Sequence, residues 1–236
     1  MPSDGALARQ LEAGVDPAGE TKDQLMRAAE HLFAREGIDG TPIRQINQLA
    51  GQRNPSAIHY HFGSKQGLIE AILLRHQTEV EVEAAQRLDE LEGAGGDVSV
   101  RDLVEAMVRP LAAKLDSASG RDFLRIVPQF IGSLDTNLRM GVARPITAQS
   151  RRLLELLEGS MDHLPEGLRR ERLVAYTLVL TSILAERARH LEARRPTHLD
   201  AEQFVVHVLD VIEAVLTAPS RVPATTEWPS RVPRPS

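Results

Sequence analysis

The chain has 236 residues, of which 42% are hydrophobic and 26% are charged, and this composition excludes a largely disordered protein. The formal net charge of −5 excludes a uniformly basic nucleic-acid coat, although it still allows a local basic surface. The absence of cysteine excludes disulfides, cysteine zinc sites and a cysteine nucleophile. No signal peptide is visible, and the most apolar stretch, residues 173–185, is shorter than the roughly 20 residues that span a membrane. We therefore expect a soluble cytoplasmic protein with no membrane partner.

The two ends of the chain differ in composition from the rest. Residues 1–20 contain three glycines and two prolines with little periodicity, and we predict a flexible N-terminal arm there. Residues 219–236 contain five prolines and repeat the string Pro-Ser-Arg-Val-Pro, a composition that neither continues a helix nor buries a core. We predict a disordered, Pro-rich tail, and a partner-binding motif is the alternative.

Caps and stops mark two helices after the arm. Thr21 begins a capping box, and Gly37 supplies the end of the first helix. Thr41 is predicted to cap the second helix, with Pro42 as its first residue. Apolar residues recur at helical spacing through both segments, so each helix is expected to bury one face.

Two further helices follow within a few residues. Asn54 is predicted to cap a third, short helix that has Pro55 as its first residue and ends at Phe62. Ser64 is predicted to cap a long fourth helix that continues to about Leu91. The short second and third helices, separated by a tight turn, are typical of a helix-turn-helix.

The rest of the chain also shows only helical signals. A glycine-rich linker at residues 93–96 is followed by segments with helical periodicity, at residues 100–115, 121–132, 143–157, 168–193 and 200–217. No stretch alternates in the pattern of a strand. We predict an all-α protein with a helix-turn-helix domain at residues 21–66 and a larger helical domain at residues 67–218.

The predicted N-terminal domain has the features of a DNA-binding unit. Its expected core holds the third helix outward, where its N-terminal end can enter a major groove, and consists of Leu25, Phe33, Ile43, Ile46, Leu49, Ile58, Phe62 and Leu68. Residues 21–65 carry six basic and four acidic side chains, whereas residues 66–92 carry two basic and seven acidic ones. The mildly positive end of a negative molecule is expected to face phosphate.

The stretch from Thr21 to about Leu73 resembles the DNA-binding domain of the tetracycline-repressor (TetR) family of bacterial regulators. The resemblance lies in Ala28-Ala29 with Leu32-Phe33, in Gly37, in Thr41 with residues 43–51, and above all in residues 58–65, Ile-His-Tyr-His-Phe-Gly-Ser-Lys. It covers about a quarter of the chain. Two departures stand out: the turn at residues 52–54 is one residue longer than usual, and His59 replaces the first Tyr of the family block.

The resemblance, together with helix geometry, implies roles in DNA binding for nine residues. Phosphate contacts are expected from Thr41 and Lys65, and a mixture of phosphate and base contacts from His59, Tyr60 and His61 on the third helix. His59 donates to phosphate more strongly when protonated. Base-edge contacts are expected from Arg53, Asn54, Ser56 and Ala57, with Ala57 touching a thymine methyl. For each residue, a solvated surface position is the alternative.

The last two long helices carry more than one apolar stripe. One stripe of the first is Leu173, Tyr176, Leu180 and Ile183, and the other is Val174, Leu178 and Ala185. The final helix likewise has Phe204, Val208, Val211 and Val215 beside Val205, Leu209, Ile212 and Leu216. A surface helix needs only one stripe, so the second predicts contact with another subunit. The resemblance implies the same homodimer through a four-helix bundle, and helices buried within one monomer are the alternative.

The resemblance also implies a small-molecule effector bound inside the C-terminal domain. Candidate pocket residues are Met107, Leu111, Phe123, Val127, Phe130, Met140, Tyr176 and Leu180, each of which is otherwise ordinary core. Few ionic residues interrupt these runs, so an apolar effector is expected.

Metal and catalytic sites are not indicated. His59 and His61 are two residues apart, so on a helix they point about 200° from one another and do not share an ion. No catalytic motif or phosphate-binding loop is visible, and we expect neither a cofactor nor an enzyme.

These observations predict a one-component transcriptional regulator. We expect a repressor that an apolar effector releases from a palindromic operator. An activator of the same fold and an architectural DNA-binding protein without an effector are the alternatives.

Overall fold

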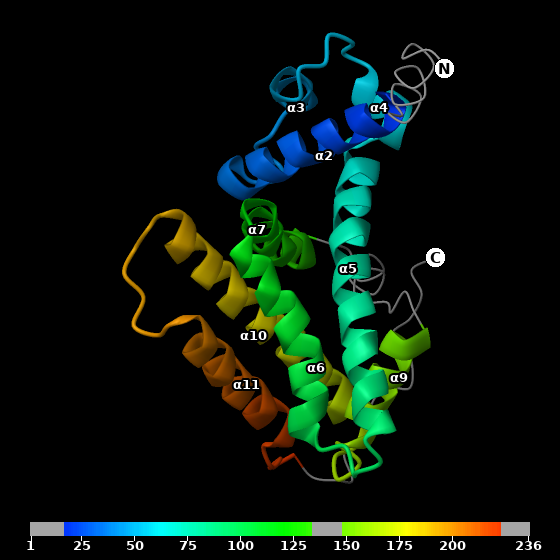
Figure 1. The fold of residues 1–236 in the computed structure, drawn as a ribbon, viewed down its shortest axis with the longest axis vertical. Helices are drawn as coiled ribbons and strands as arrows, with labels where there is room; N and C mark the ends of the chain where they lie inside the picture. The colour runs from blue at the N-terminus through cyan, green and yellow to red at the C-terminus, as the bar shows by residue number, and fades with distance from the viewer. Residues whose placement is uncertain (1–16, 134–147, 223–236) are drawn as a thin grey trace, which may run out of the picture.

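The computed structural model describes residues 17–133 and 148–222, and this part of the chain is helical without strands (Figure 1). The predicted all-α class is confirmed. The elements are α2 (Pro17–Glu36), α3 (Ile43–Leu49), α4 (Ala57–Phe62), α5 (Lys65–Gly93), α6 (Val100–Ala112), a short 3-10 helix η1 (Ala113–Asp116), α7 (Ala118–Ser133), α9 (Ala148–Gly159), α10 (Glu166–Glu192) and α11 (Ala201–Thr217). None of these helices is long and apolar enough to cross a membrane.

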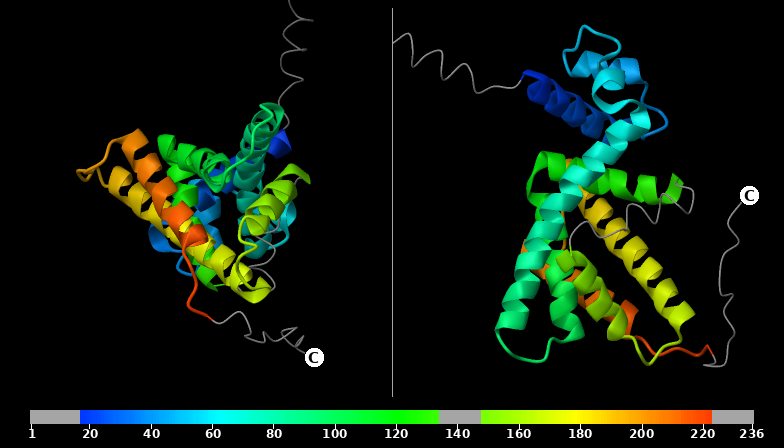
Figure 2. Two further views of the ribbon diagram at one scale, coloured as in Figure 1. Left: turned by 90° about the horizontal axis from the view of Figure 1, so that it is seen from below. Right: turned by 90° about the vertical axis from the view of Figure 1, so that its right-hand side faces the viewer.

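The small N-terminal domain, α2 to α4 with the start of α5, stands at one end of the larger C-terminal domain (Figure 2). Its core contains most of the side chains predicted for it: Leu25, Phe33, Ile46, Ile58 and Leu68 are buried, and Phe62 is half-buried. Ile43 and Leu49 were predicted inside but are 38% and 53% exposed. Asn47 is buried beside Ile46, and Leu49 lies about 200° from Asn47 around the helix, so Leu49 points outward.

Three predicted caps are wrong in detail. Helix α2 begins at Pro17, inside the predicted arm and ahead of Thr21, because proline fits the first turn of a helix. Pro42, not Thr41, occupies the cap position of α3 and makes no side-chain cap bond. Helix α4 begins at Ala57, and its cap residue Ser56 likewise makes no side-chain cap bond.

Helix α5 joins the two domains and begins as predicted. The Ser64 hydroxyl accepts a hydrogen bond from the backbone N–H of Gly67, at 3.0 Å, and so caps the helix. The helix ends at Gly93, at the predicted linker, where Gly95 adopts a positive φ of 71°. Of the predicted helix at residues 143–157 and the predicted tail, residues 143–147 and 223–236 lie outside the described residues.

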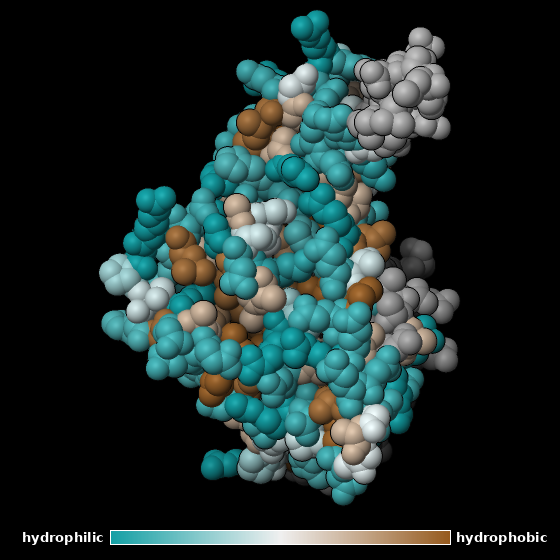
Figure 3. Space-filling model, viewed as in Figure 1, coloured by the Kyte–Doolittle hydropathy of each residue, from teal (hydrophilic) through white to brown (hydrophobic). Residues whose placement is uncertain are grey.

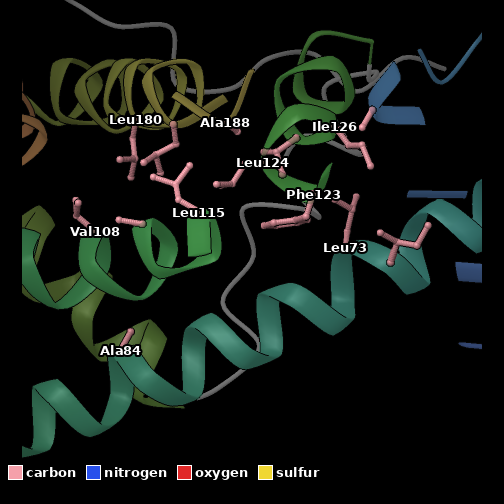
Figure 4. Close-up of a cluster of buried hydrophobic side chains, with 14 of the residues drawn as sticks. Leu73, Ala84, Val108, Leu115, Phe123, Leu124, Ile126, Leu180 and Ala188 are labelled. Atoms are coloured by element: carbon pink, nitrogen blue, oxygen red, sulfur yellow. The ribbon is translucent and has the colours of Figure 1, made fainter. Parts of the chain in front are cut away.

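The C-terminal domain is built around a core shared by α6, α7 and α10. Leu115, Leu124 and Leu180 come from three elements and point toward one another (Figure 4). Phe123 lies near Leu73 of α5 in the same view, so one core extends to the connecting helix. Helix α7 packs against both α10 and α2, and it thereby contacts the N-terminal domain directly.

Apolar residues remain exposed on the outer side of α10 and α11. Val174 and Leu178 on α10 are 55% and 47% exposed, and Val206 on α11 is 40% exposed. Hydrophobic residues are visible on the side where these helices lie, in separate patches (Figure 3). Ala185, which was assigned to the outer stripe, is fully buried.

A buried carboxylate, Glu30 of α2, ties the N-terminal domain to the rest of the molecule. Its side chain accepts hydrogen bonds from His76 Nε2 at 2.9 Å and Ser119 Oγ at 2.7 Å, and it pairs with Arg75. The ring of His76 stacks on Phe123, with 4.3 Å between centroids. Burial raises the pKa of Glu30, but the hydrogen bonds and the charge of Arg75 outweigh it and hold the pKa below its ordinary value.

Two further contacts join α2 to the C-terminal domain. Arg35 donates to Asp122 of α7 at 3.3 Å and to Glu192 of α10 at 2.7 Å. Gln129 of α7 accepts from the backbone N–H of Ile38, at 3.3 Å, just beyond the end of α2. The orientation of α2 on α7 is therefore defined at three points along the helix.

Glu30→Gln is expected to lower the free energy of unfolding at pH 7 by about 3 kcal/mol, because it removes one partner of a buried ion pair. The pKa of Glu30 is lowered in the folded state, so its ionised form contributes stability above the unfolded pKa of about 4.5. That stability is lost as the pH falls through the folded pKa. Denaturant unfolding followed by circular dichroism between pH 7 and pH 3 checks this, and equal stability of the two proteins at pH 7 would contradict it.

Candidate nucleic-acid interface

The end of the N-terminal domain farthest from the C-terminal domain is formed by α3, the turn before α4, and α4 (Figure 1). In this turn, Arg53, Asn54 and Ser56 are all exposed. The side chain of Asn54 accepts a hydrogen bond from the backbone N–H of Ser56, at 2.9 Å, in place of the predicted helix cap. Three of the four residues predicted to contact base edges are thus available at the tip of the molecule.

Helix α4 presents its polar side chains outward. Tyr60 is 80% exposed and His59 is also exposed. His61 is half-buried and packs edge-on against the ring of Tyr60, with 4.9 Å between centroids. Aromatic and imidazole donors on an exposed helix suit contacts to phosphate oxygens and base edges. His59 and Tyr60 are thus on the surface, with His61 half-buried beside them, and their contacts with DNA stay a prediction.

Two predicted contact residues are buried. Ala57 is 5% exposed because it faces the core beside Ile58, so its methyl group is not available to a thymine. Thr41 is fully buried, and its hydroxyl donates to the carbonyl oxygen of Gly37 at 2.7 Å. A phosphate contact by the Thr41 hydroxyl is therefore excluded in this conformation.

Lys65 is engaged inside the domain, contrary to its predicted position on the DNA backbone. Its ammonium donates to the carbonyl oxygens of Ile38 and Thr41, at 2.5 and 2.7 Å, and lies 5.6 Å from the ring centroid of Phe33. Burial lowers its pKa, an effect that the charge of Asp39 partly opposes. Lys65 therefore fastens the start of α5 to the loop between α2 and α3.

Three other cations of this domain were counted in the charge balance but not assigned to the site. Lys22, Arg27 and Arg44 are exposed, and Lys22 lies 5.7 Å from the ring centroid of Phe62. Within the described residues, neither they nor Arg53 form an ion pair with a carboxylate. By contrast, Arg35, Arg75 and Arg125 near the domain junction are paired. Unpaired cations are available to bind phosphate. Which cations are paired and which are unpaired could not be predicted from the sequence.

The candidate effector residues form part of the core. Phe123, Val127, Tyr176 and Leu180 are buried, while Met107 and Leu111 are half-buried. The side chain of Phe130 and all of Met140 lie outside the described residues. Neither of two hollows in the described part has these residues in its wall: one lies between α5 and α6, and the other beside Arg27 and Leu49.

Metal ligands are not gathered in the described part of the chain. No three His, Asp or Glu side chains there lie close enough together to hold an ion.

Comparison with known proteins identifies the domain that carries this surface. Residues 25–72 match the family model described as "Bacterial regulatory proteins, tetR family". This domain is therefore similar to the DNA-binding domain of the TetR family. The matched residues lie within the segment that the sequence analysis assigned to the family, and that assignment is confirmed.

Two curated relatives come from Pseudomonas putida. The chain is 36% identical to the HTH-type transcriptional repressor NicS over 82 residues, which cover 34% of this chain and 38% of NicS. It is 38% identical to the HTH-type transcriptional regulator TtgR over 58 residues, which cover 25% of this chain and 27% of TtgR. The chain thus spans less than two fifths of the length of the curated relatives it matches. These relatives are named as transcriptional regulators and not as enzymes, which agrees with the class predicted from the sequence.

The likeness to a solved structure extends over more of the chain. NalD of Pseudomonas aeruginosa superposes with a TM-score of 0.51 at 20% identity, covering 83% of this chain and 96% of that one. At this identity the likeness shows the fold alone.

Lys65→Ala is expected to destabilise the protein, because charge-assisted hydrogen bonds are each worth about 1.5–3 kcal/mol. The same change is expected to weaken binding to all duplexes alike, since the loop before α3 loses its anchor. Lys22→Ala is the matched control, and it should leave the melting temperature unchanged. It should reduce the slope of log affinity against log salt concentration by roughly 1, the value for one phosphate contact. Thermal melting and titrations at several salt concentrations check both variants, and an unchanged melting temperature for Lys65→Ala would contradict its internal role.

Proposed function

We propose that the chain is a dimeric transcriptional regulator of the TetR family that binds a palindromic operator and acts as a repressor. The observation that carries the proposal is the exposed tip of the family's DNA-binding domain, where Arg53, Asn54 and Ser56 stand beside His59 and Tyr60 of α4. Arginine and asparagine side chains form hydrogen bonds with base edges in the major groove.

Dimerisation is supported by the apolar outer side of α10 and α11. Val174 and Leu178 are one turn apart on the same face of α10, and both are about half exposed. Val206 adds an exposed apolar side chain on α11, which packs against α10. A face of this kind is buried when two copies form a four-helix bundle. Two DNA-binding domains related by a two-fold axis then contact half-sites about 34–36 Å apart or a multiple of that spacing.

Repression is supported by the names of relatives. NicS is named a transcriptional repressor, and NalD is described as the secondary repressor of a multidrug efflux pump. A repressor that binds bacterial DNA acts in the cytoplasm, which is the location we propose. An activator remains a second form of the same function, because the sign of regulation depends on the position of the operator.

We further propose an apolar small-molecule effector bound among α6, α7 and α10. Among the described candidate residues, Met107, Leu111, Phe123, Val127 and Leu180 are apolar, and Tyr176 carries a hydroxyl that donates to the sulfur of Met107, at 3.7 Å. A thioether is a weak acceptor. Burial raises the pKa of Tyr176 further above neutral pH, and the protonated phenol could exchange this weak acceptor for a carbonyl or hydroxyl on an otherwise apolar effector.

Selection from a pool of genomic fragments at physiological salt tests the DNA-binding function. We expect the retained fragments to share a palindrome. Arg53→Ala should then relax the base preference at one position of each half-site by about 1–3 kcal/mol. Arg44→Ala is the matched control, which should weaken binding to all sequences alike. Retention without any shared sequence would contradict specific regulation and favour an architectural binder.

Leu178→Glu is expected to convert the dimer to a monomer, because it places a charge in the proposed apolar contact. The exposed position makes a loss of helical content unexpected. Glu171→Ala serves as the control, because Glu171 is exposed and lies two turns before Leu178 on α10. Analytical ultracentrifugation measures the mass of each, and a Leu178→Glu variant that sediments like the unchanged protein would exclude this face as the dimer contact.

A further inference from the structure

The buried residue Asn47 of α3 contacts both ends of the turn between α3 and α4. Its side-chain nitrogen Nδ2 donates to the carbonyl oxygen of Pro55 at 2.8 Å, and its backbone carbonyl oxygen accepts from the backbone N–H of Gln52 at 2.9 Å. Asn47 therefore binds both the beginning and the end of the turn that carries Arg53 and Asn54. The turn is otherwise exposed at residues 53–56.

The buried side chain of Asn47 does not make all of its possible hydrogen bonds. The residue is 4% exposed, and its Oδ1 atom is buried without a hydrogen-bond partner. An unpaired buried oxygen costs free energy, and a small apolar residue at this position of α3 avoids that cost. Stability alone therefore does not explain an amide here. What the amide supplies is the bond from Nδ2 to the far end of the turn.

This bond bears on the side chains of the tip. The turn is exposed from residue 53 to residue 56, and ordering an exposed turn costs conformational entropy. Asn54 adds a local bond to the N–H of Ser56, but that bond stays within the turn and does not connect it to α3. Gln52 connects the beginning of the turn to Gln24 of α2, at 3.2 Å, and the side chain of Asn47 connects its end, at Pro55, to α3.

We infer that Asn47 is a positioning residue for base recognition: it never touches DNA, and it sets operator specificity by holding the turn in one conformation. The inference rests on the proposed DNA-binding function. A side chain that only filled space would change stability without changing the preference for one sequence over another. A side chain that orders the turn changes that preference and leaves phosphate-mediated affinity in place.

Two variants separate these roles. Asn47→Ala removes the side chain, and Asn47→Thr keeps a similar volume with a hydroxyl that bonds to the preceding helical turn and is too short to reach Pro55. Gln48→Ala is the matched control, because Gln48 is an exposed amide next along the same helix. We expect both Asn47 variants to lose roughly tenfold or more of the ratio between operator and scrambled-duplex affinity, with scrambled-duplex affinity unchanged. Gln48→Ala should keep the ratio.

Hydrogen exchange of the peptide covering residues 50–57 supplies a readout that needs no DNA. Exchange in this peptide should accelerate in both Asn47 variants and not in Gln48→Ala. Unchanged exchange, an unchanged affinity ratio, or loss of the whole fold in both variants would each overturn the inference. If the unaltered protein itself prefers no sequence, the proposed function fails, and the exchange measurement still decides whether Asn47 orders the turn.

Discussion

The position of the DNA-binding domain depends on one buried carboxylate. Glu30 lies near the middle of α2 and is 1% exposed, yet it keeps its charge because Arg75, His76 and Ser119 surround it. These partners come from α5 and α7, so a single group joins the first helix, the connecting helix and the C-terminal domain. A buried charge that loses one partner becomes costly, and α2 is therefore held in one orientation on α7.

This arrangement connects the proposed effector region with the DNA-binding surface. Phe123 is a candidate effector residue and also stacks on His76, which in turn donates to Glu30. Farther along α7, Gln129 binds the backbone N–H of Ile38, and Lys65 binds the carbonyl oxygen of the same residue. A displacement of α7 by a ligand would therefore act on both ends of the contact with α2. The effector region and the DNA-binding domain are thus connected through packed and hydrogen-bonded side chains, and each of these side chains can be tested by mutation.

The sequence predicted helices and their order because apolar spacing and caps such as Ser64 are local signals. It failed where a side chain bonds to a backbone carbonyl inside the domain and is not presented to solvent. The Thr41 hydroxyl donates to the carbonyl oxygen of Gly37, and the Lys65 ammonium donates to carbonyl oxygens 24 and 27 residues away. The DNA-binding tip was recognised through the family resemblance, but the burial of Ala57 depended on where α4 begins. The position of Asn47 under the turn had no signal in the sequence, since burial of an amide is set by tertiary packing.

In the proposed dimer, two such tips contact one DNA duplex at a fixed separation. Hydroxyl-radical footprinting of the dimer on its selected operator tests this most directly. Two protected stretches are expected on each strand, with centres about 10–10.5 base pairs apart or a multiple of that spacing, on one face of the duplex. A single protected stretch, or protection that does not depend on sequence, would contradict it.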